Sequence, residues 1–70
     1  MAYVVRITER YSVDYIAEGR TYTVNGEHFV PLTGKIKEAK KYKTFALAQR
    51  ASLRNAENLY GTIEIIEAEG

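Results

Sequence analysis

The stretch of residues 39–61 constrains the fold most, because it reads as a short basic strand that leads directly into one helix. Thr44 is a good N-cap, since its hydroxyl oxygen can accept a hydrogen bond from the exposed amides of a first helical turn. The apolar spacing that follows predicts a helix over about residues 45–58. Gly61 is expected to end this helix.

The predicted helix has one side made mostly of small residues. At about 100° per residue, this side collects Phe45, Ala48, Ala51, Ser52, Ala56, Leu59 and Tyr60. Small side chains allow a helix to lie close to a sheet, and the larger Phe45 and Leu59 would cover its two ends. Arg50 and Arg54 fall on the opposite, solvent-facing side, together with Leu47.

The rest of the chain predicts strands. Residues 3–8 alternate between apolar and polar positions, and residues 11–18 do the same after a turn. Residues 62–67 alternate again, and we expect this last strand to lie beside residues 3–8 with the helix across one face. The fold class is therefore α+β, a single domain over residues 1–70 with an antiparallel-rich sheet of four to five strands and one helix packed on one face.

The strongest local signal is a β-hairpin around Asn25 and Gly26. Both residues tolerate the positive φ angles of a type I′ turn, whose twist matches that of the flanking strands. A two-residue loop places Tyr22 opposite Phe29, which gives an aromatic cross-strand pair. Pro31 cannot donate a ladder hydrogen bond, so we expect the hairpin to end there or to lie at a sheet edge, followed by a loop.

The composition excludes several classes of site. The 70 residues include no cysteine, which excludes a disulfide framework and a thiolate metal site. His28 is the single histidine, and no serine or carboxylate is placed to form a catalytic triad with it. Glu9, Asp14 and Glu18 lack the fixed spacing of a calcium loop. We expect no catalytic residue, no metal and no cofactor.

No segment is expected to enter a membrane. The longest apolar runs fall well short of the roughly 20 residues that span a bilayer. The first residues lack the basic and apolar regions of a signal peptide. We therefore expect a cytoplasmic protein.

Six tyrosines stand in a chain that has no tryptophan. One helix cannot bury all of them, so some should lie at the surface, where tyrosine contributes a large contact area at low entropic cost. Tyr11 and Tyr15, expected on one strand face, are the leading candidates for a protein contact, with Tyr22 and Phe29 joining them if exposed. The alternative is that these residues are ordinary strand formers.

Charge is distributed unevenly along the chain. The net charge is +1 overall, but residues 35–54 carry a net +6 and residues 55–70 a net −4. The basic members of the first segment are Lys35, Lys37, Lys40, Lys41, Lys43, Arg50 and Arg54. With Tyr42 among them, they could bind a phosphate backbone and stack a base. The alternative is that this basic block pairs with the acidic last strand and is otherwise solvated.

Three segments carry a resemblance to a known group of proteins. They read Tyr-Val-Val-Arg-Ile at residues 3–7, Glu-Ala-Lys-Lys-Tyr-Lys-Thr at residues 38–44 and Ile-Glu-Ile-Ile-Glu at residues 63–67. The chain resembles small proteins encoded by phages and prophages of Gram-positive bacteria, with a longer hairpin. This resemblance implies a compact β-sheet with one packed helix. It favours a loop and a short strand near residues 40–42 over the helical turn that the local apolar spacing also allows.

Some phage proteins of this size, including anti-CRISPR proteins, bind and block a host defence protein. We therefore expect a non-catalytic phage-type accessory protein of the bacterial host cytoplasm that binds a host protein, for example as an inhibitor of a defence system such as CRISPR–Cas. Two alternatives stay open. One is a small nucleic-acid-binding module that uses the basic block, and the other is a self-associating structural protein, such as a homodimer that covers the face left free by the helix.

Overall fold

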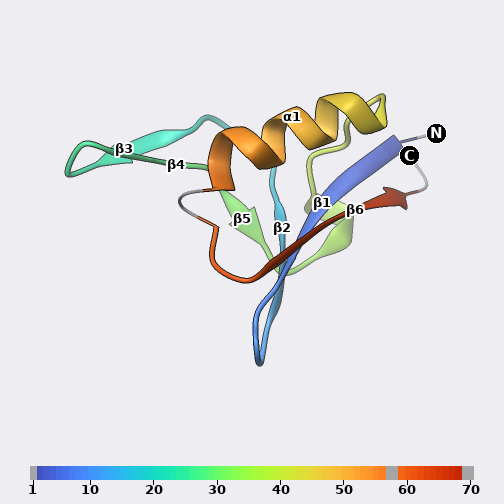
Figure 1. The fold of residues 1–70 in the computed structure, drawn as a ribbon, viewed down its shortest axis with the longest axis horizontal. Helices are drawn as coiled ribbons and strands as arrows, with labels where there is room; N and C mark the ends of the chain where they lie inside the picture. Colours follow the sequence, from blue (N-terminus) through green and yellow to red (C-terminus); the bar gives the residue numbers. More distant parts are fainter. Residues whose placement is uncertain (1, 57–58, 69–70) are drawn as a thin grey trace.

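The computed structural model describes residues 2–56 and 59–68. The elements are β1 (Ala2–Thr8), β2 (Val13–Ile16), β3 (Tyr22–Val24), β4 (Glu27–Phe29), β5 (Leu32–Thr33), the 3-10 helix η1 (Ile36–Glu38), α1 (Phe45–Asn55) and β6 (Thr62–Ala68). The predicted α+β class is confirmed. Four strands form an antiparallel sheet in the order β5-β2-β1-β6, and β3 and β4 form a separate two-stranded sheet (Figure 1).

The first and last strands form the longest pairing in the sheet. β1 and β6 run antiparallel in an unbroken register from Ala2 opposite Ala68 to Thr8 opposite Thr62. The alternation of apolar and polar residues holds over most of both strands, but Val4 is completely buried although it lies on the face opposite to Val5. The prediction that the last strand lies beside the first is therefore confirmed.

The core lies between α1 and one face of the sheet, across which the helix runs (Figure 1). Its buried members are Val5, Ile7, Ile16, Ala48 and Leu59. Ala48 and Ser52 are the buried residues of α1, so small side chains do face the sheet as the sequence predicts. Phe45 is half exposed instead of buried, and its ring meets that of Tyr3 edge-on at a centroid distance of 6.0 Å.

The helix begins as predicted and ends without the predicted glycine. The Thr44 hydroxyl accepts a hydrogen bond from the Leu47 amide at 3.2 Å, which confirms the N-cap. The last helical residue is Asn55, and Ala56 is the C-cap. Residues 57 and 58, where the sequence places the helix end, lie outside the described residues. Gly61 does not cap α1, because the residues just before it are not helical, and it belongs to the turn that enters β6.

The predicted short strand near residues 40–42 is wrong. The helical turn that the spacing also allowed is present as η1, and the chain after it makes two isolated bridges, one between Ala39 and Ala17 and one between Tyr42 and Tyr3. The reason is that β1 and β2 pair only through the last part of β1 and then separate. The segment of residues 39–42 lies in this gap, where Tyr42 exchanges two backbone hydrogen bonds with Tyr3 of β1 and the Lys40 amide donates one to the Ile16 carbonyl of β2.

The sheet edge beside β2 is short. β5 follows Pro31 directly and contains two residues, which pair with the end of β2 through Ile16 opposite Leu32. The Pro31 carbonyl accepts a hydrogen bond from the Ala17 amide at 2.8 Å, although its ring nitrogen cannot donate. Thr33 belongs to this strand and not to the expected loop. The hairpin strand β4 ends at Phe29, before Pro31, which is one of the two outcomes that the sequence predicts.

Candidate protein-binding arm and basic surface

The hairpin of β3 and β4 forms an arm that projects from the body of the molecule (Figure 1). Its turn has positive φ at both central residues, +52° at Asn25 and +83° at Gly26, as a type I′ turn requires. The predicted register is confirmed, with Tyr22 opposite Phe29. The turn and register of this arm are therefore those that its local sequence predicts.

One face of the arm carries apolar side chains that the core does not use. The rings of Tyr22 and Phe29 stack at a centroid distance of 5.6 Å and an interplanar angle of 21°. Tyr22 is 52% exposed and Val24, on the same face, is 48% exposed. Every residue from 18 to 28 is exposed. An isolated two-stranded hairpin is marginally stable in water, so this arm presents apolar surface with little support of its own.

The opposite face of the arm is polar. Thr23 lies opposite His28, and the Thr23 hydroxyl oxygen is 3.2 Å from Nδ1 of the His28 ring. His28 is exposed. His28 is therefore a surface residue of β4 that lies opposite Thr23.

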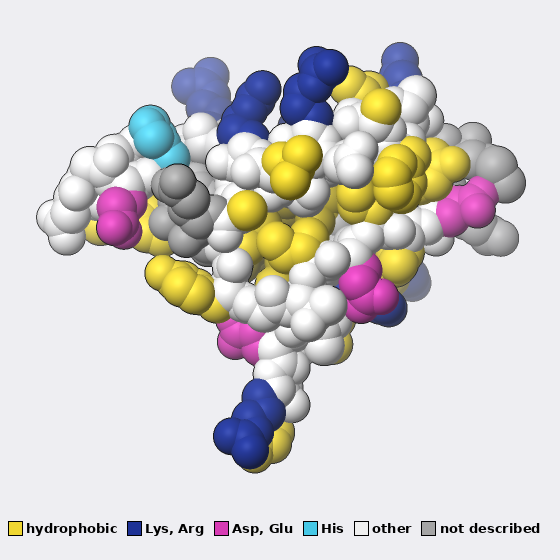
Figure 2. Space-filling view, in the orientation of Figure 1, with side chains coloured by type: hydrophobic (Ala, Val, Ile, Leu, Met, Phe, Trp, Pro, Cys, Tyr) yellow, Lys and Arg dark blue, Asp and Glu magenta, His cyan; other side chains and the backbone are white. Residues whose placement is uncertain are grey.

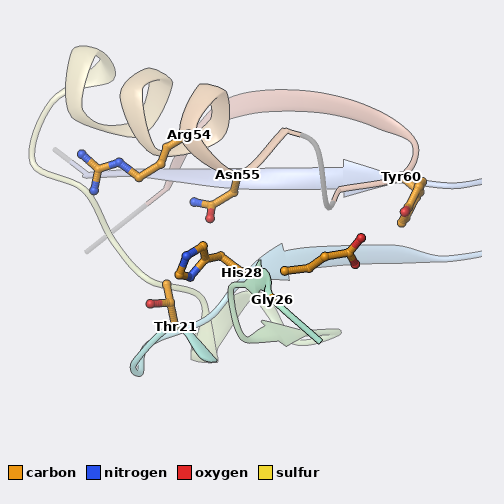
Figure 3. A pocket seen from close by; sticks show the side chains of 7 residues that line it. Thr21, Gly26, His28, Arg54, Asn55 and Tyr60 are labelled. Carbon is orange, nitrogen blue, oxygen red and sulfur yellow. The ribbon is translucent and has the colours of Figure 1, made fainter. Parts of the chain in front are cut away.

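A pocket of about 640 Å³ separates the arm from the end of α1 (Figure 3). It is lined by Thr21, Gly26, Glu27, His28, Arg54, Asn55 and Tyr60. The Asn55 side-chain amide donates a hydrogen bond to the Ala51 carbonyl at 2.8 Å and is engaged by the helix. The pocket carries charges of both signs, since Arg54 and Glu27 both line it. The sequence did not predict this pocket, because only the tertiary fold brings the hairpin and the helix end together.

Tyr11 lies at the tip of the β1–β2 hairpin and is 91% exposed. The Glu9 amide donates to the Ser12 carbonyl at 2.8 Å to close the turn, and β2 begins only at Val13. The Arg10 guanidinium lies 5.6 Å from the centroid of the Tyr11 ring. The expectation that Tyr11 shares a strand face with Tyr15 is wrong, because Tyr11 is part of the turn.

Tyr15 lies on the sheet face opposite α1. It stands across from Arg6 on β1 and from Thr33 on β5. Arg6 reaches over to β6, where its Nη2 lies 3.2 Å from Oε1 of Glu64. Tyr15 is half-buried at this place, so less of its ring is offered to a partner than for Tyr11. Of the four predicted contact residues, the structure thus brings Tyr22 and Phe29 together and places Tyr11 and Tyr15 at two other positions.

The seven basic residues of the block come from η1, from the connections on either side of it and from α1. All are exposed except Lys40, which is half-buried. Figure 2 shows Lys and Arg side chains in a row along the side of the molecule formed by α1. Arg50 and Arg54 are one helical turn apart and share this outward side with Leu47.

The acidic residues of β6 do not neutralise the basic block. Among the described residues, the ion pair present is that of Arg6 with Glu64, and no member of the block pairs with a described carboxylate. Glu57 and Glu69, the other acidic residues of this region, lie outside the described residues. Glu64 and Glu67 therefore do not occupy the side chains of the basic block.

Tyr42 is held by the body of the protein. Its ring packs against the core, its backbone bridges to Tyr3, and the Nζ atom of Lys40 lies 5.4 Å from its ring centroid. Burial, with a smaller effect from the negative charge of Glu18, raises the pKa of Tyr42 above its usual value. The sequence placed Tyr42 in the basic block as a stacking residue, whereas the structure uses it to join β1 to the segment that precedes α1.

No group of three or more His, Asp or Glu side chains that could hold a metal ion occurs within residues 2–56 and 59–68. None of the helices in this part of the chain is long and apolar enough to cross a membrane. Comparison with protein-family models, with curated proteins and with solved structures found no match to this chain.

Proposed function

We propose that this chain is a non-catalytic binding protein and that the β3–β4 arm contacts its protein partner. The observation that carries this proposal is the apolar face of the arm, where Tyr22 and Val24 are about half exposed beside Phe29. These side chains add nothing to the buried core between α1 and the sheet.

The stacked pair also suits a contact on energetic grounds. Tyrosine and phenylalanine have few rotatable bonds, so they lose little entropy when a partner covers them. The rings of Tyr22 and Phe29 are already stacked on each other in the free protein. A partner that covers the arm would therefore gain apolar contact area at a low ordering cost.

The resemblance to small phage-encoded proteins suggests the class of partner. In that form of the proposal, the chain is an accessory protein that binds a host defence protein, such as a CRISPR–Cas component, and blocks it by occupying a surface. Blocking requires shape and contact area but no reacting group, which suits an exposed arm.

Removal of the aromatic pair tests the proposal. We expect Tyr22→Ala with Phe29→Ala to weaken partner binding by at least about 2 kcal/mol, roughly 30-fold, because aromatic contacts at interface centres reach this size. The measurement is an affinity pull-down of the tagged chain from bacterial lysate, with and without nuclease, followed by a binding titration with the purified captured protein.

Tyr11→Ala is the matched control, since it removes an exposed tyrosine from the opposite hairpin tip. It should bind like the wild type. Equal titration curves for the arm variant and the wild type would exclude the arm as the contact. Capture that disappears with nuclease would exclude a protein partner altogether.

The row of basic side chains along α1 favours a second candidate function, binding to a nucleic-acid backbone. Each phosphate contact releases counterions, so affinity should fall steeply with salt. We expect Arg50→Glu with Arg54→Glu to weaken binding to a duplex or single strand at least about tenfold and to reduce the slope of log affinity against log salt by about 2.

Arg10→Glu with Arg20→Glu serves as the control, because it changes the net charge equally and leaves α1 intact. Fluorescence anisotropy at several salt concentrations measures both effects. If both double variants lose affinity equally, only net charge matters, and the basic side of α1 is not a specific site.

A further inference from the structure

β6 is the outermost strand on one side of the four-stranded sheet, next to β1 (Figure 1). It pairs with β1 along its whole length. Beyond that pairing, β6 has no backbone hydrogen bond to any other described segment. One edge of this strand therefore keeps its hydrogen-bonding groups free.

The bonds of β1 show which groups of β6 are free. The Tyr3 amide and carbonyl both bond to Tyr42, at 2.9 and 2.8 Å, so they point away from β6. Successive residues of a strand direct their backbone groups to opposite edges. The neighbours of Tyr3 therefore bond to β6, through the pairs that include Val4 with Ile66. It follows that Ile63, Ile65 and Glu67 direct their N–H and C=O groups outward.

The two edge strands of the sheet, β5 and β6, differ in length and in composition. β5, at the opposite edge, has two residues and stands between Pro31 and Gly34, which prevents long pairing. β6 has seven residues and an unbroken register. Its sequence contains no proline and no lysine, and Glu64 and Glu67 are the charged residues that it presents. The chain protects one edge and leaves the other open for pairing.

We propose that the free edge of β6 pairs with β6 of a second copy of this chain, antiparallel and centred on Ile65. In this register Ile65 faces Ile65 of the second copy, and Ile63 faces Glu67. All three outward N–H groups and all three outward C=O groups of each copy then form hydrogen bonds. The two sheets join into one continuous sheet through an isologous contact.

The side chains agree with this register. No glutamate faces a glutamate, because Glu64 lies opposite Ile66 of the second copy, and Glu64 is already neutralised by Arg6 at 3.2 Å. Ile65 and Ile66 are only half-buried in a single copy. A second strand would cover more of both side chains and bring two β-branched Ile65 residues into a cross-strand pair.

Glu67→Pro tests the pairing. Glu67 has an exposed side chain, and its N–H makes no bond to β1, so proline removes an outward donor and is tolerated at a free edge. Glu67→Ala is the control that removes the charge and keeps the donor. Sedimentation equilibrium over a wide concentration range should give a monomer–dimer equilibrium for the wild type and the control. For Glu67→Pro, the same measurement should give a dimer dissociation constant at least about tenfold higher than that of the wild type.

Amide hydrogen exchange of the wild type provides a reading that does not depend on a variant. The Ile63, Ile65 and Glu67 amides should gain protection as protein concentration rises, whereas the Ile66 amide should be protected at every concentration. A monomeric wild type at all concentrations would overturn the proposal and leave the edge for a strand of another protein. An unchanged dimer in Glu67→Pro would also overturn it. Arm variants should leave the dimer intact, so this test fails or succeeds independently of the proposed function.

Discussion

Replacing Gly61 with alanine is expected to lower the free energy of unfolding by about 3 kcal/mol or more, because two effects combine. Gly61 has φ of +129°, which L-residues rarely adopt. An alanine Cβ would lie 2.5 Å from the Thr8 carbonyl oxygen and 3.0 Å from the Glu9 side chain. The Thr8 carbonyl cannot retreat easily, because Thr8 and Thr62 form the first pair of the β1–β6 register.

Urea unfolding followed by circular dichroism measures this loss. Gly34→Ala is the control, since an added Cβ there meets nothing within 4 Å and no unusual φ is required. The control should stay within about 0.5 kcal/mol of the wild type. If Gly61→Ala were as stable as Gly34→Ala, the result would contradict the close contact between this turn and the end of β1.

The second large effect is expected for Ile16→Ala, with a loss of about 3–4 kcal/mol. Ile16 is completely buried and belongs to the core under α1. It stands where β2 leaves β1, and its carbonyl accepts the Lys40 amide at 2.8 Å, which fixes the segment that fills the gap. A domain of this size is stable by only about 4–10 kcal/mol, so the variant should lie close to unfolding.

Leu32 provides the matched control for Ile16. It is the cross-strand neighbour of Ile16 on β5 and is 46% exposed. We expect Leu32→Ala to cost less than about 1 kcal/mol in the same urea titration. Equal losses for the two variants would show that the burial of Ile16 in the core contributes little to stability.

Those parts of the fold that depend on local sequence could be predicted. The alternation of residues 3–8 and 62–67, the hydroxyl of Thr44 and the Asn25-Gly26 turn each act within a few residues, and the structure contains all of them. The position of β6 beside β1 followed from the order of these elements, and the structure shows that the two strands are antiparallel. The register of the arm followed from its two-residue turn.

The parts that depend on tertiary contacts could not be predicted. Residues 39–42 make single bridges because β1 and β2 separate, and nothing in their own sequence indicates that separation. Gly61 carries the signature of a helix stop, yet its positive φ serves the close turn beside Thr8. Tyr11 follows the alternation of β2 but lies in the turn, because the Glu9–Ser12 hydrogen bond closes the chain before it.

For the candidate surfaces, too, the features set by local sequence were predictable and those set by tertiary contacts were not. Sequence predicted the aromatic pair of the arm, since Tyr22 and Phe29 face each other through a local turn. Sequence could not predict that Tyr11 and Tyr15 would be separated from that pair. Nor could it predict that Tyr42 would pack into the core while the basic side chains of α1 remained outside.

The most direct test of the proposed function is photo-crosslinking from the arm. A photoreactive phenylalanine derivative replaces Tyr22, or in parallel the exposed Leu53 on α1, and the chain is irradiated in nuclease-treated bacterial lysate. We expect one protein to cross-link from position 22 and not from position 53, with excess wild-type chain preventing the reaction and the Phe29→Ala background reducing it. Cross-linking from position 53 alone, or no protein cross-link at position 22, would contradict the assignment of the arm as the binding surface.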